Sequence, residues 1–358
     1  MKQLDNKTGI NLVALAAVLL ALAGCQFVVP PKLYQSRAPY PEPLETGDLE
    51  TGSTEFTVLT YNVEGLPWPA RARRGPRLRL IERQLAAMKR ARTAPDIVLI
   101  QEAFSREAIS IARNSGYANV LPGPGRRDRR LTLSAPVSVE HVRERRLVRG
   151  ERIIGKRANA GLYILTDFEV IEHATEPFSR RACAGFDCVS NKGVMLVRLR
   201  IPGRPWQIDV ANTHFNSRSA ARVSEARADR AHGYQVEEST LFLAAIRDPD
   251  LPAIYGGDFN MRRAHDRFYS FSQYKPDWQI SHRFCAERRD LCEVLLSWDG
   301  DEPWMDTQDL QLFQSSDSVE ITPVRIEAVF DAPFDGYSLS DHDGLLVTYR
   351  IGLRERPG

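Results

Sequence analysis

The stretch Gly256-Gly257-Asp258-Phe259-Asn260 carries the most information about the fold of this 358-residue chain. It follows the short apolar run 253–255, which predicts a buried strand. Asp and Asn are ordinary turn residues, because their side chains bond to the local backbone, so a simple turn is one interpretation. A carboxylate and a carboxamide at a strand end can also bind a metal ion or a phosphate. The choice depends on whether similar residues end other strands.

Four further segments end an apolar run with polar residues of this kind. They are Leu59-Thr60-Tyr61-Asn62-Val63, Gln101-Glu102, Asn212-Thr213-His214-Phe215-Asn216 and Ser340-Asp341-His342. Each is weak evidence alone, since a single histidine after a strand is more often structural than catalytic. Together they supply carboxylates, carboxamides and imidazoles that one sheet could gather around a single cleft. The remaining histidines lie outside such segments and are interpreted as structural or exposed: His141, His173, His232, His265 and His282.

Apolar and β-branched runs predict strands along most of the chain. The expected ranges are 56–61, 97–100, 161–166, 194–200, 207–212, 253–255, 324–330 and 345–349. Leu78, Ile81, Leu85 and Met88 recur at helical spacing, and a second helix is expected within 220–247. Many strands with few long helices indicate an α/β fold of two packed sheets flanked by helices. No internal linker or repeat divides residues 54–353, so we expect one large domain.

In this order and setting, the segments resemble the endonuclease/exonuclease/phosphatase superfamily over essentially the whole domain. Gly257-Asp258-Phe259-Asn260 and Ser340-Asp341-His342 are the most diagnostic matches, and 160–165 resembles an internal strand of that family. The resemblance implies a four-layer α/β sandwich with two mixed sheets. One departure is Arg325-Ile326-Glu327, where Arg-Ile-Asp is commoner in the family, so Glu327 receives no role.

Oxygen ligands suit Mg²⁺, a hard cation that keeps several of its waters, so Glu102 with Asn62 beside it is a sufficient protein contribution. Mn²⁺ is the alternative ion for the same ligands. The family resemblance implies that Asp341 ligates the metal or supports the site. Such an ion polarises a phosphate and offsets charge on the leaving oxygen.

The resemblance also assigns the acid–base work. It implies that His342 either takes a proton from the attacking water or orients the phosphate, and a pKa near neutrality suits both tasks. Asp258 and Asn260 are expected to place the water and a phosphate oxygen, and His214 to donate to phosphoryl oxygens as negative charge builds. No covalent enzyme intermediate is expected, because the chain lacks the arrangement of a serine or cysteine nucleophile.

The segment Asn191-Lys192-Gly193-Val194 resembles the neutral sphingomyelinase branch, and Lys192 could meet a substrate phosphate as a point charge. A disulfide-closed surface loop with an exposed lysine is the alternative. The favoured function is a phosphodiesterase that removes the head group of sphingomyelin or a similar phospholipid, without an obligate protein partner. A non-catalytic binding lipoprotein is disfavoured, because a pure binder needs no pairing of metal ligands with a general base.

An envelope nuclease is the second candidate. The net charge of +2 gives no general indication of a nucleic-acid partner, but the range 126–157 holds eleven Lys and Arg against four acidic residues. Such a stretch could grip a nucleic-acid backbone, with Arg126, Arg127, Arg129 and Arg130 foremost, or it could hold anionic lipid head groups. A solvated charged loop is the third interpretation. Trp278, Trp298 and Trp304 are candidate interfacial contacts, although scattered aromatic residues are more often part of a core.

The N-terminal residues have the pattern of a secretory signal. Lys2 and Lys7 precede the apolar run 12–23, and Leu22-Ala23-Gly24-Cys25 resembles a bacterial lipobox. We therefore expect a signal peptide at 1–24, acylation of Cys25, and a Pro- and Gly-rich tether over 25–53. An ordinary signal peptide with a chance cysteine is the alternative. Gln26 is not the Asp typical of inner-membrane retention, so the envelope location favoured is the outer membrane.

Four more cysteines follow in a chain expected to reach an oxidising compartment. An even number without a CxxC pair favours disulfides over a zinc site. The simplest of the three possible connectivities pairs neighbours, Cys183 with Cys188 and Cys285 with Cys292, and free buried thiols are the alternative.

Overall fold

The computed structural model describes residues 52–354 except 69, 131–155, 181, 276, 298–301, 334–335 and 337. The expected signal peptide, Cys25, nearly all of the tether, most of the basic range 126–157 and Trp298 lie outside the described residues. In the part of the chain that is described, none of the helices combines the length and the apolar composition that a membrane span requires.

One sheet has seven strands and contains both ends of the described chain. Its parallel pairs are β1 with β2 and β10 with β12, and its other neighbours are antiparallel, so the sheet is mixed. In spatial order the strands are β10 (Glu293–Leu295), β12 (Val319–Val329), β13 (Gly344–Leu353), β1 (Ser53–Asn62), β2 (Ile97–Gln101), β4 (Tyr163–Thr166) and β3 (Asn119–Pro122).

The second sheet has six strands and is also mixed, since β7 and β8 are parallel and the other pairs antiparallel. In spatial order they are β5 (Glu169–Pro177), β6 (Gly193–Arg200), β7 (Gln207–His214), β8 (Ala253–Asp258), β11 (Asp309–Gln314) and β9 (Gln279–Ile280).

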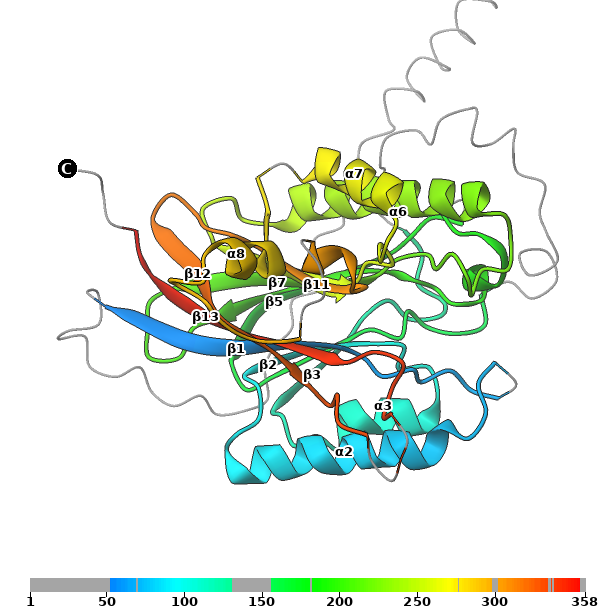
Figure 1. The fold of residues 1–358 in the computed structure, drawn as a ribbon, viewed down its shortest axis with the longest axis horizontal. Coiled ribbons are helices and arrows are strands. Elements are labelled where there is room, and N and C mark those ends of the chain that lie inside the picture. The colour runs from blue at the N-terminus through cyan, green and yellow to red at the C-terminus, as the bar shows by residue number, and fades with distance from the viewer. Residues whose placement is uncertain are drawn as a thin grey trace, which may run out of the picture.

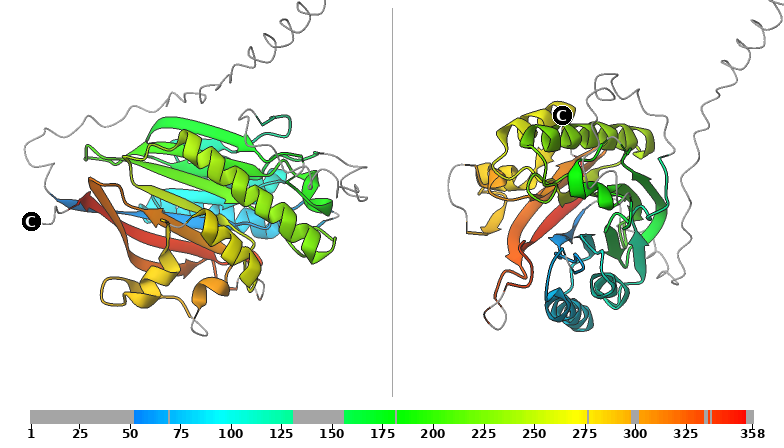
Figure 2. Two further views of the ribbon diagram at one scale, coloured as in Figure 1. Left: turned by 90° about the horizontal axis from the view of Figure 1, so that it is seen from above. Right: turned by 90° about the vertical axis from the view of Figure 1, so that its right-hand side faces the viewer.

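Helices cover the outer face of each sheet, and the sheets pack against each other in the middle (Figure 1, Figure 2). Helices α2 (Arg74–Ala91) and α3 (Arg106–Arg113) lie against the first sheet, and α6 (Glu225–Ile246) and α7 (His265–Tyr274) against the second. Shorter elements are α8 (Ser281–Glu287) and the 3₁₀ turns η1 (Gly185–Val189) and η2 (Pro303–Met305). The predicted four-layer α/β sandwich is thus confirmed.

Three apolar clusters hold these layers together. The largest lies between the sheets, where Val58 and Leu99 of one sheet pack with Val197 and Ile208 of the other. A second joins α6 and α7 to their sheet, and a third joins α2 and α3 to theirs. Leu78, Ile81 and Leu85 are buried on α2 as their helical spacing predicts, whereas Met88 is only partly buried.

Five of the described strands escaped the sequence prediction: β3, β5, β9, β10 and β11. Of these, β3, β9 and β10 have only two to four residues, whereas β5 and β11 are longer. β5 mixes apolar and polar residues without a regular period, His173 and three glutamates among them, because it is the edge of its sheet. β11 contains a buried Gln311, whose side chain donates to the carbonyls of Val58 and Leu345 in the facing sheet. Only three of the six residues of β11 are apolar, so its strand signal in the sequence is weak.

Both disulfides join neighbouring cysteines, as the simplest connectivity predicts. Cys183–Cys188 closes the loop that contains η1, and Cys285–Cys292 joins α8 to the start of β10.

Candidate active site

The strand-end residues meet at one edge of the sandwich. Asn62 ends β1 and Glu102 follows β2, while His214 ends β7 and Asp258 ends β8. Each pair of strands is parallel, and the register places Asn62 opposite Gln101 and His214 opposite Asp258. Because the carboxyl ends of parallel strands lie on the same side, the packed sheets bring all four side chains to one edge.

Two carboxylates, the partly buried Glu102 and the buried Asp258, form the centre of this site. The Asn62 amide donates to Asp258 at 2.9 Å, and His214 Nε2 lies 3.4 Å from Asp258 and 3.9 Å from Glu102. Burial, reinforced by the charge of Asp258, raises the pKa of Glu102 from its ordinary value near 4.5 to about 7. Burial likewise raises the pKa of Asp258 to about 6, although His342 opposes the rise. Both carboxyl groups are therefore more easily protonated than an ordinary exposed carboxylate.

This donor set fits a divalent cation of the Mg²⁺ type. The oxygens of Glu102, Asp258 and Asn62 are hard ligands, and a cation between them would offset the cost of burying two carboxylates, which raises both carboxyl pKa values. Glu102 has a left-handed backbone (φ 58°), which turns the chain sharply as it leaves β2. Glu102 and Asn62, predicted from the sequence as metal ligands, are therefore placed where they could hold such an ion.

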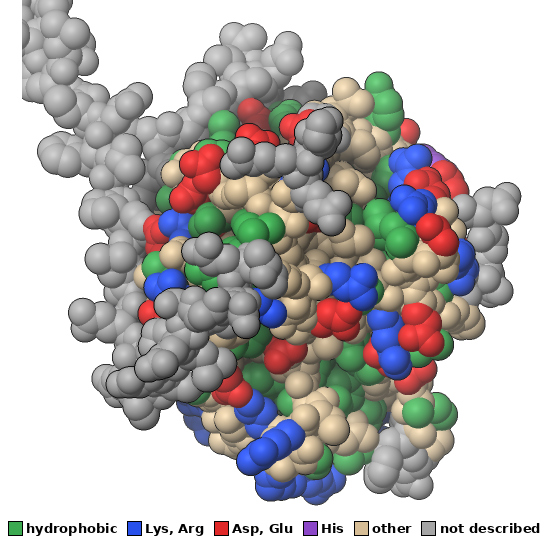
Figure 3. Space-filling view, turned by 90° about the vertical axis from the view of Figure 1, so that its left-hand side faces the viewer, with side chains coloured by type: hydrophobic (Ala, Val, Ile, Leu, Met, Phe, Trp, Pro, Cys, Tyr) green, Lys and Arg blue, Asp and Glu red, His purple; other side chains and the backbone are tan. Residues whose placement is uncertain are grey.

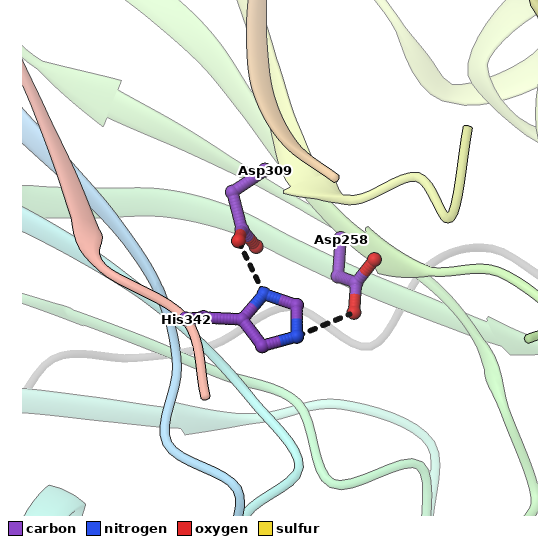
Figure 4. A group of neighbouring side chains, drawn as sticks. All are labelled: Asp258, Asp309 and His342. Atoms are coloured by element: carbon purple, nitrogen blue, oxygen red, sulfur yellow. Dashed lines mark hydrogen bonds and ion pairs between the residues drawn. The ribbon is translucent and has the colours of Figure 1, made fainter. Parts of the chain in front are cut away.

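A second group contains His342, Asp309 and Asp258 (Figure 4). The ligand atoms of these three side chains lie within 4.8 Å of one another, so they too could hold a cation. However, His342 Nδ1 is hydrogen-bonded to Asp309, and its Nε2 points to Asp258 at 3.9 Å. Burial by itself lowers the pKa of His342, but Asp309, helped by Asp258 and Asp341, raises it well above its ordinary value overall. The metal-free site therefore presents a protonated imidazole held by a carboxylate.

Lys192 and His214 form the opposite wall of the site. The Lys192 ammonium donates to Asp187 at 3.0 Å and to the carbonyl of Phe215 at 2.8 Å, and it lies 3.1 Å from His214 Nε2. Burial first and the charge of Lys192 second lower the pKa of His214 well below its ordinary value. His214 is therefore neutral. The alternative interpretation of Lys192 as an exposed loop lysine is wrong, because this residue is only 4% exposed.

This geometry gives a testable expectation for Lys192→Met. The change keeps the aliphatic stem but removes the charge that helps to hold the pKa of His214 down, so that pKa should rise. Titration of the His214 ring by nuclear magnetic resonance measures the shift, with the distant His265 as internal control. An unchanged His214 titration would show that burial alone keeps this ring neutral.

The family of the chain follows from a sequence comparison. A model of the Endonuclease/Exonuclease/phosphatase family matches residues 59–314, well over half of the chain, and spans every site residue described so far except Asp341 and His342. The chain belongs to this family. The site therefore stands on a phosphoesterase fold. No curated protein sequence matches the chain.

Solved structures share the family fold at low identity. Sphingomyelinase C from Streptomyces griseocarneus matches with a TM-score of 0.57 and 18% identity, over 82% of this chain and 99% of its own. A beta toxin variant from Staphylococcus aureus, with bound magnesium ions, has a TM-score of 0.56 and 17% identity over the same shares. D. rerio TDP2 with a single-strand DNA product has a TM-score of 0.54 and 14% identity, over 83% of this chain and 99% of its own.

The contacts of Asp341 and Asn260 bear on the roles expected of them. The side chain of Asp341 is half-exposed and pairs with Arg71 at 3.2 Å, while its other oxygen lies 3.8 Å from His342. It lies at the rim, which favours support of the site over metal ligation. The Asn260 amide nitrogen, expected to contact phosphate, donates instead to the carbonyl of Phe215 at 3.1 Å.

Two arginines build the frame of this family site and were not foreseen. Arg74 donates to the carbonyls of Val63, Glu64 and Leu339, and so joins the loops that follow β1 and precede His342. Arg267 donates to the carbonyls of Asn216 and Asn260, beyond the ends of β7 and β8. Because neither residue ends a strand, the pattern used for the other site residues could not find them.

Asp309 was missed for a different reason. It begins β11, whereas Asp258 ends β8, and β11 itself was not predicted. Its partner in the register is Asp258. An apolar alternation over 310–313 was the available signal.

Several residues proposed from the sequence as nucleic-acid or membrane contacts have partners within the protein instead. Arg130 pairs with Glu176 and Glu238, so it is not free to grip a nucleic acid, whereas Arg126, Arg127 and Arg129 are exposed. Trp304 is buried and Trp278 is partly buried against Tyr255, so neither is an interfacial residue. His232 and His282 are buried, His173 is partly buried and His265 is exposed, as expected of residues outside the site; His141 lies outside the described residues.

Proposed function

We propose that the chain is a metal-dependent phosphodiesterase that hydrolyses a phospholipid head group. The observation that carries this proposal is the meeting of Glu102, Asn62 and Asp258 with the His342–Asp309 pair at one edge of the sandwich. Oxygen ligands, a proton acceptor and a cationic donor are the groups that hydrolysis of a phosphodiester by water requires.

The residues divide this work according to their charges. A bound Mg²⁺ supplies polarisation of the phosphate and neutralises charge on the leaving oxygen. His342, protonated against Asp309, donates Nε2–H to a phosphoryl oxygen, the second of the two roles expected of it. Asp258 is the group able to accept a proton from the attacking water, because its pKa of about 6 leaves it ionised yet basic near neutral pH. Asn62 orients that carboxylate.

The lipid substrate is supported by two observations. One solved neighbour is a sphingomyelinase C, and the Asn191–Val194 segment that resembles that branch packs directly beside His214 through Lys192. Lys192 would act by fixing His214 and the η1 loop rather than as an exposed phosphate contact. A nuclease is the alternative, and it rests on the DNA-bound D. rerio TDP2 and on the exposed Arg126, Arg127 and Arg129.

A substrate panel tests the proposal. The chain should release phosphocholine from sphingomyelin in detergent with Mg²⁺, and chelator should abolish the release. Phosphatidylcholine, inositol phosphates and single- and double-stranded DNA serve as comparisons, and Mn²⁺ as the second metal. Nicking of DNA with all lipids untouched would replace the lipid substrate by nucleic acid. Full activity in excess chelator would remove the metal dependence.

We also propose that the protein is anchored in the bacterial envelope through acylated Cys25, most consistent with the outer membrane. Leu22-Ala23-Gly24-Cys25 and the preceding apolar run motivate this location. Cys25→Ser should move the protein from the membrane to the soluble fraction, because it removes the acylation site. The contrary result is a Cys25→Ser protein that lacks residues 1–24 and yet stays in the membrane fraction after a high-salt wash. The anchor would then lie elsewhere.

A further inference from the structure

The outer face of α2 and α3 carries arginines that the catalytic site does not use. Arg79, Arg83 and Arg90 form one stripe of α2, since residues four and seven apart share a helix face, and Arg106 and Arg113 do the same on α3. All five are exposed, and none forms an ion pair with another described residue. We call these five residues the arginine face. Figure 3 shows Lys and Arg side chains gathered at the lower edge of the molecule, where α2 lies.

The few acidic residues nearby do not neutralise this surface. A groove of about 370 Å³ between the helices is lined by three of the arginines together with Glu82 and Glu107. Glu82 is partly buried and accepts hydrogen bonds from Ser110 and Asn114, so it serves the contact between the helices. These two carboxylates would repel a phosphodiester strand lying in the groove. The exposed arginines remain free to reach a broad anionic surface outside it.

An exposed tryptophan stands at one end of this surface. Trp68 is 81% exposed, more than any other large hydrophobic side chain in the described part of the chain. It lies in the loop between β1 and α2, and Arg71 of the same loop pairs with Glu64 and with Asp341 beside His342. The loop therefore borders the active site. An indole suits the boundary between lipid and water, because it is apolar in body and polar at its N–H.

Helix α2 links the Trp68 loop to the end of the domain at which β1 begins. Helix α2 runs back from the Trp68 loop, over about 27 Å, toward the end of the molecule where β1 begins (Figure 1). Ser53, at the start of β1, is where the N-terminal segment joins the domain. A domain attached from its N-terminal side can thus lie lengthwise on a bilayer, with the arginine face down and the active-site loop at the surface.

We propose that the arginine face and Trp68 form a docking surface for a bilayer rich in anionic phospholipid. The arginines attract the negative surface potential, and Trp68 enters the head-group region beside the active site. This surface brings the site to lipids in the membrane, but binding does not depend on which phosphoester is cleaved.

Vesicle flotation tests the docking surface separately from catalysis. All proteins carry Cys25→Ser, so that no acyl chain contributes, and the vesicles contain phosphatidylglycerol and phosphatidylcholine without sphingomyelin. Arg79→Glu with Arg83→Glu should weaken binding to the anionic vesicles at least about tenfold, and Trp68→Ala should weaken it several-fold. Raising the salt concentration should weaken binding of the parent protein and have less effect on the double variant.

Matched controls separate this surface from general charge and hydrophobicity. Arg283→Glu with Arg350→Glu makes the same change in net charge at exposed positions on α8 and β13, and Tyr269→Ala removes a 69% exposed aromatic ring on α7. Both should bind as the parent does. Equal losses in test and control variants, or equal binding to vesicles of phosphatidylcholine alone, would overturn the proposal. A third outcome would also overturn it: the parent protein binds DNA but no vesicles, and Arg79→Glu with Arg83→Glu abolishes the DNA binding. The arginine face would then be a nucleic-acid surface.

Discussion

His342→Ala should lower turnover by about a hundredfold or more while leaving the fold intact, the usual scale for a positioned acid–base group. The ring is held by Asp309 on one side and faces Asp258 on the other, so its loss removes the cationic donor from the site without opening an apolar core. Turnover with saturating Mg²⁺ is the measurement, and the thermal unfolding midpoint is the control. A well-folded variant with unchanged turnover would exclude His342 from the reaction.

Asp309→Asn separates the two roles that a histidine can have here. Because Asp309 raises the pKa of His342, the variant should have a lower His342 pKa and lose the imidazolium at a lower pH. If protonated His342 holds the phosphate, the loss of activity with rising pH should begin at a lower pH in the variant than in the wild type. If neutral His342 acts as the base, activity should instead extend to lower pH. A pH profile of turnover therefore decides between them.

The sequence predicted the meeting of Asn62, Glu102, His214 and Asp258 better than it predicted their roles. Their positions follow from a local signal, a polar residue at the end of an apolar strand, and strand packing then brings such ends together. What each side chain contacts depends on the opposite sheet. Lys192 illustrates this limit: its sequence suggests a loop lysine, yet Asp187 and the Phe215 carbonyl bury its ammonium.

Elements that are polar along their length were the hardest to predict. β5 and β11 escaped because an edge strand needs no continuous apolar pattern, and because the buried Gln311 is satisfied by carbonyls of the facing sheet. Whether a buried polar side chain finds hydrogen-bond partners depends on the packing of the whole molecule, not on the local sequence. Because β11 was not predicted, its first residue Asp309, the partner that sets the charge of His342, was not predicted either. The exposed tryptophan was also not predicted, since the candidate Trp278 is partly buried and Trp68 is exposed.

Glu102→Gln should abolish metal-dependent activity and yet stabilise the metal-free protein above pH 7. Burial raises the pKa of Glu102 to about 7 from an ordinary value near 4.5, so between these values the folded protein binds more protons than the unfolded chain. Stability of the metal-free wild type therefore falls as pH rises through this window, by about 3 kcal/mol once pH 7 is passed. Glutamine fills the same space without a charge, so it escapes this loss but cannot ligate Mg²⁺ as a carboxylate does.

Thermal unfolding of the wild type and of Glu102→Gln tests both the expected gain in stability and the expected loss of Mg²⁺ binding. With chelator at pH 8, Glu102→Gln should unfold several degrees above the wild type, and at pH 4 the difference should nearly vanish because Glu102 is then protonated in both states. Added Mg²⁺ should raise the unfolding midpoint of the wild type at pH 8 much more than that of the variant, since a ligand stabilises only the state that binds it. Equal stabilisation of both proteins by Mg²⁺, or a variant that keeps its activity, would show that the ion is held elsewhere, with the Asp258, Asp309 and His342 group as the next candidate.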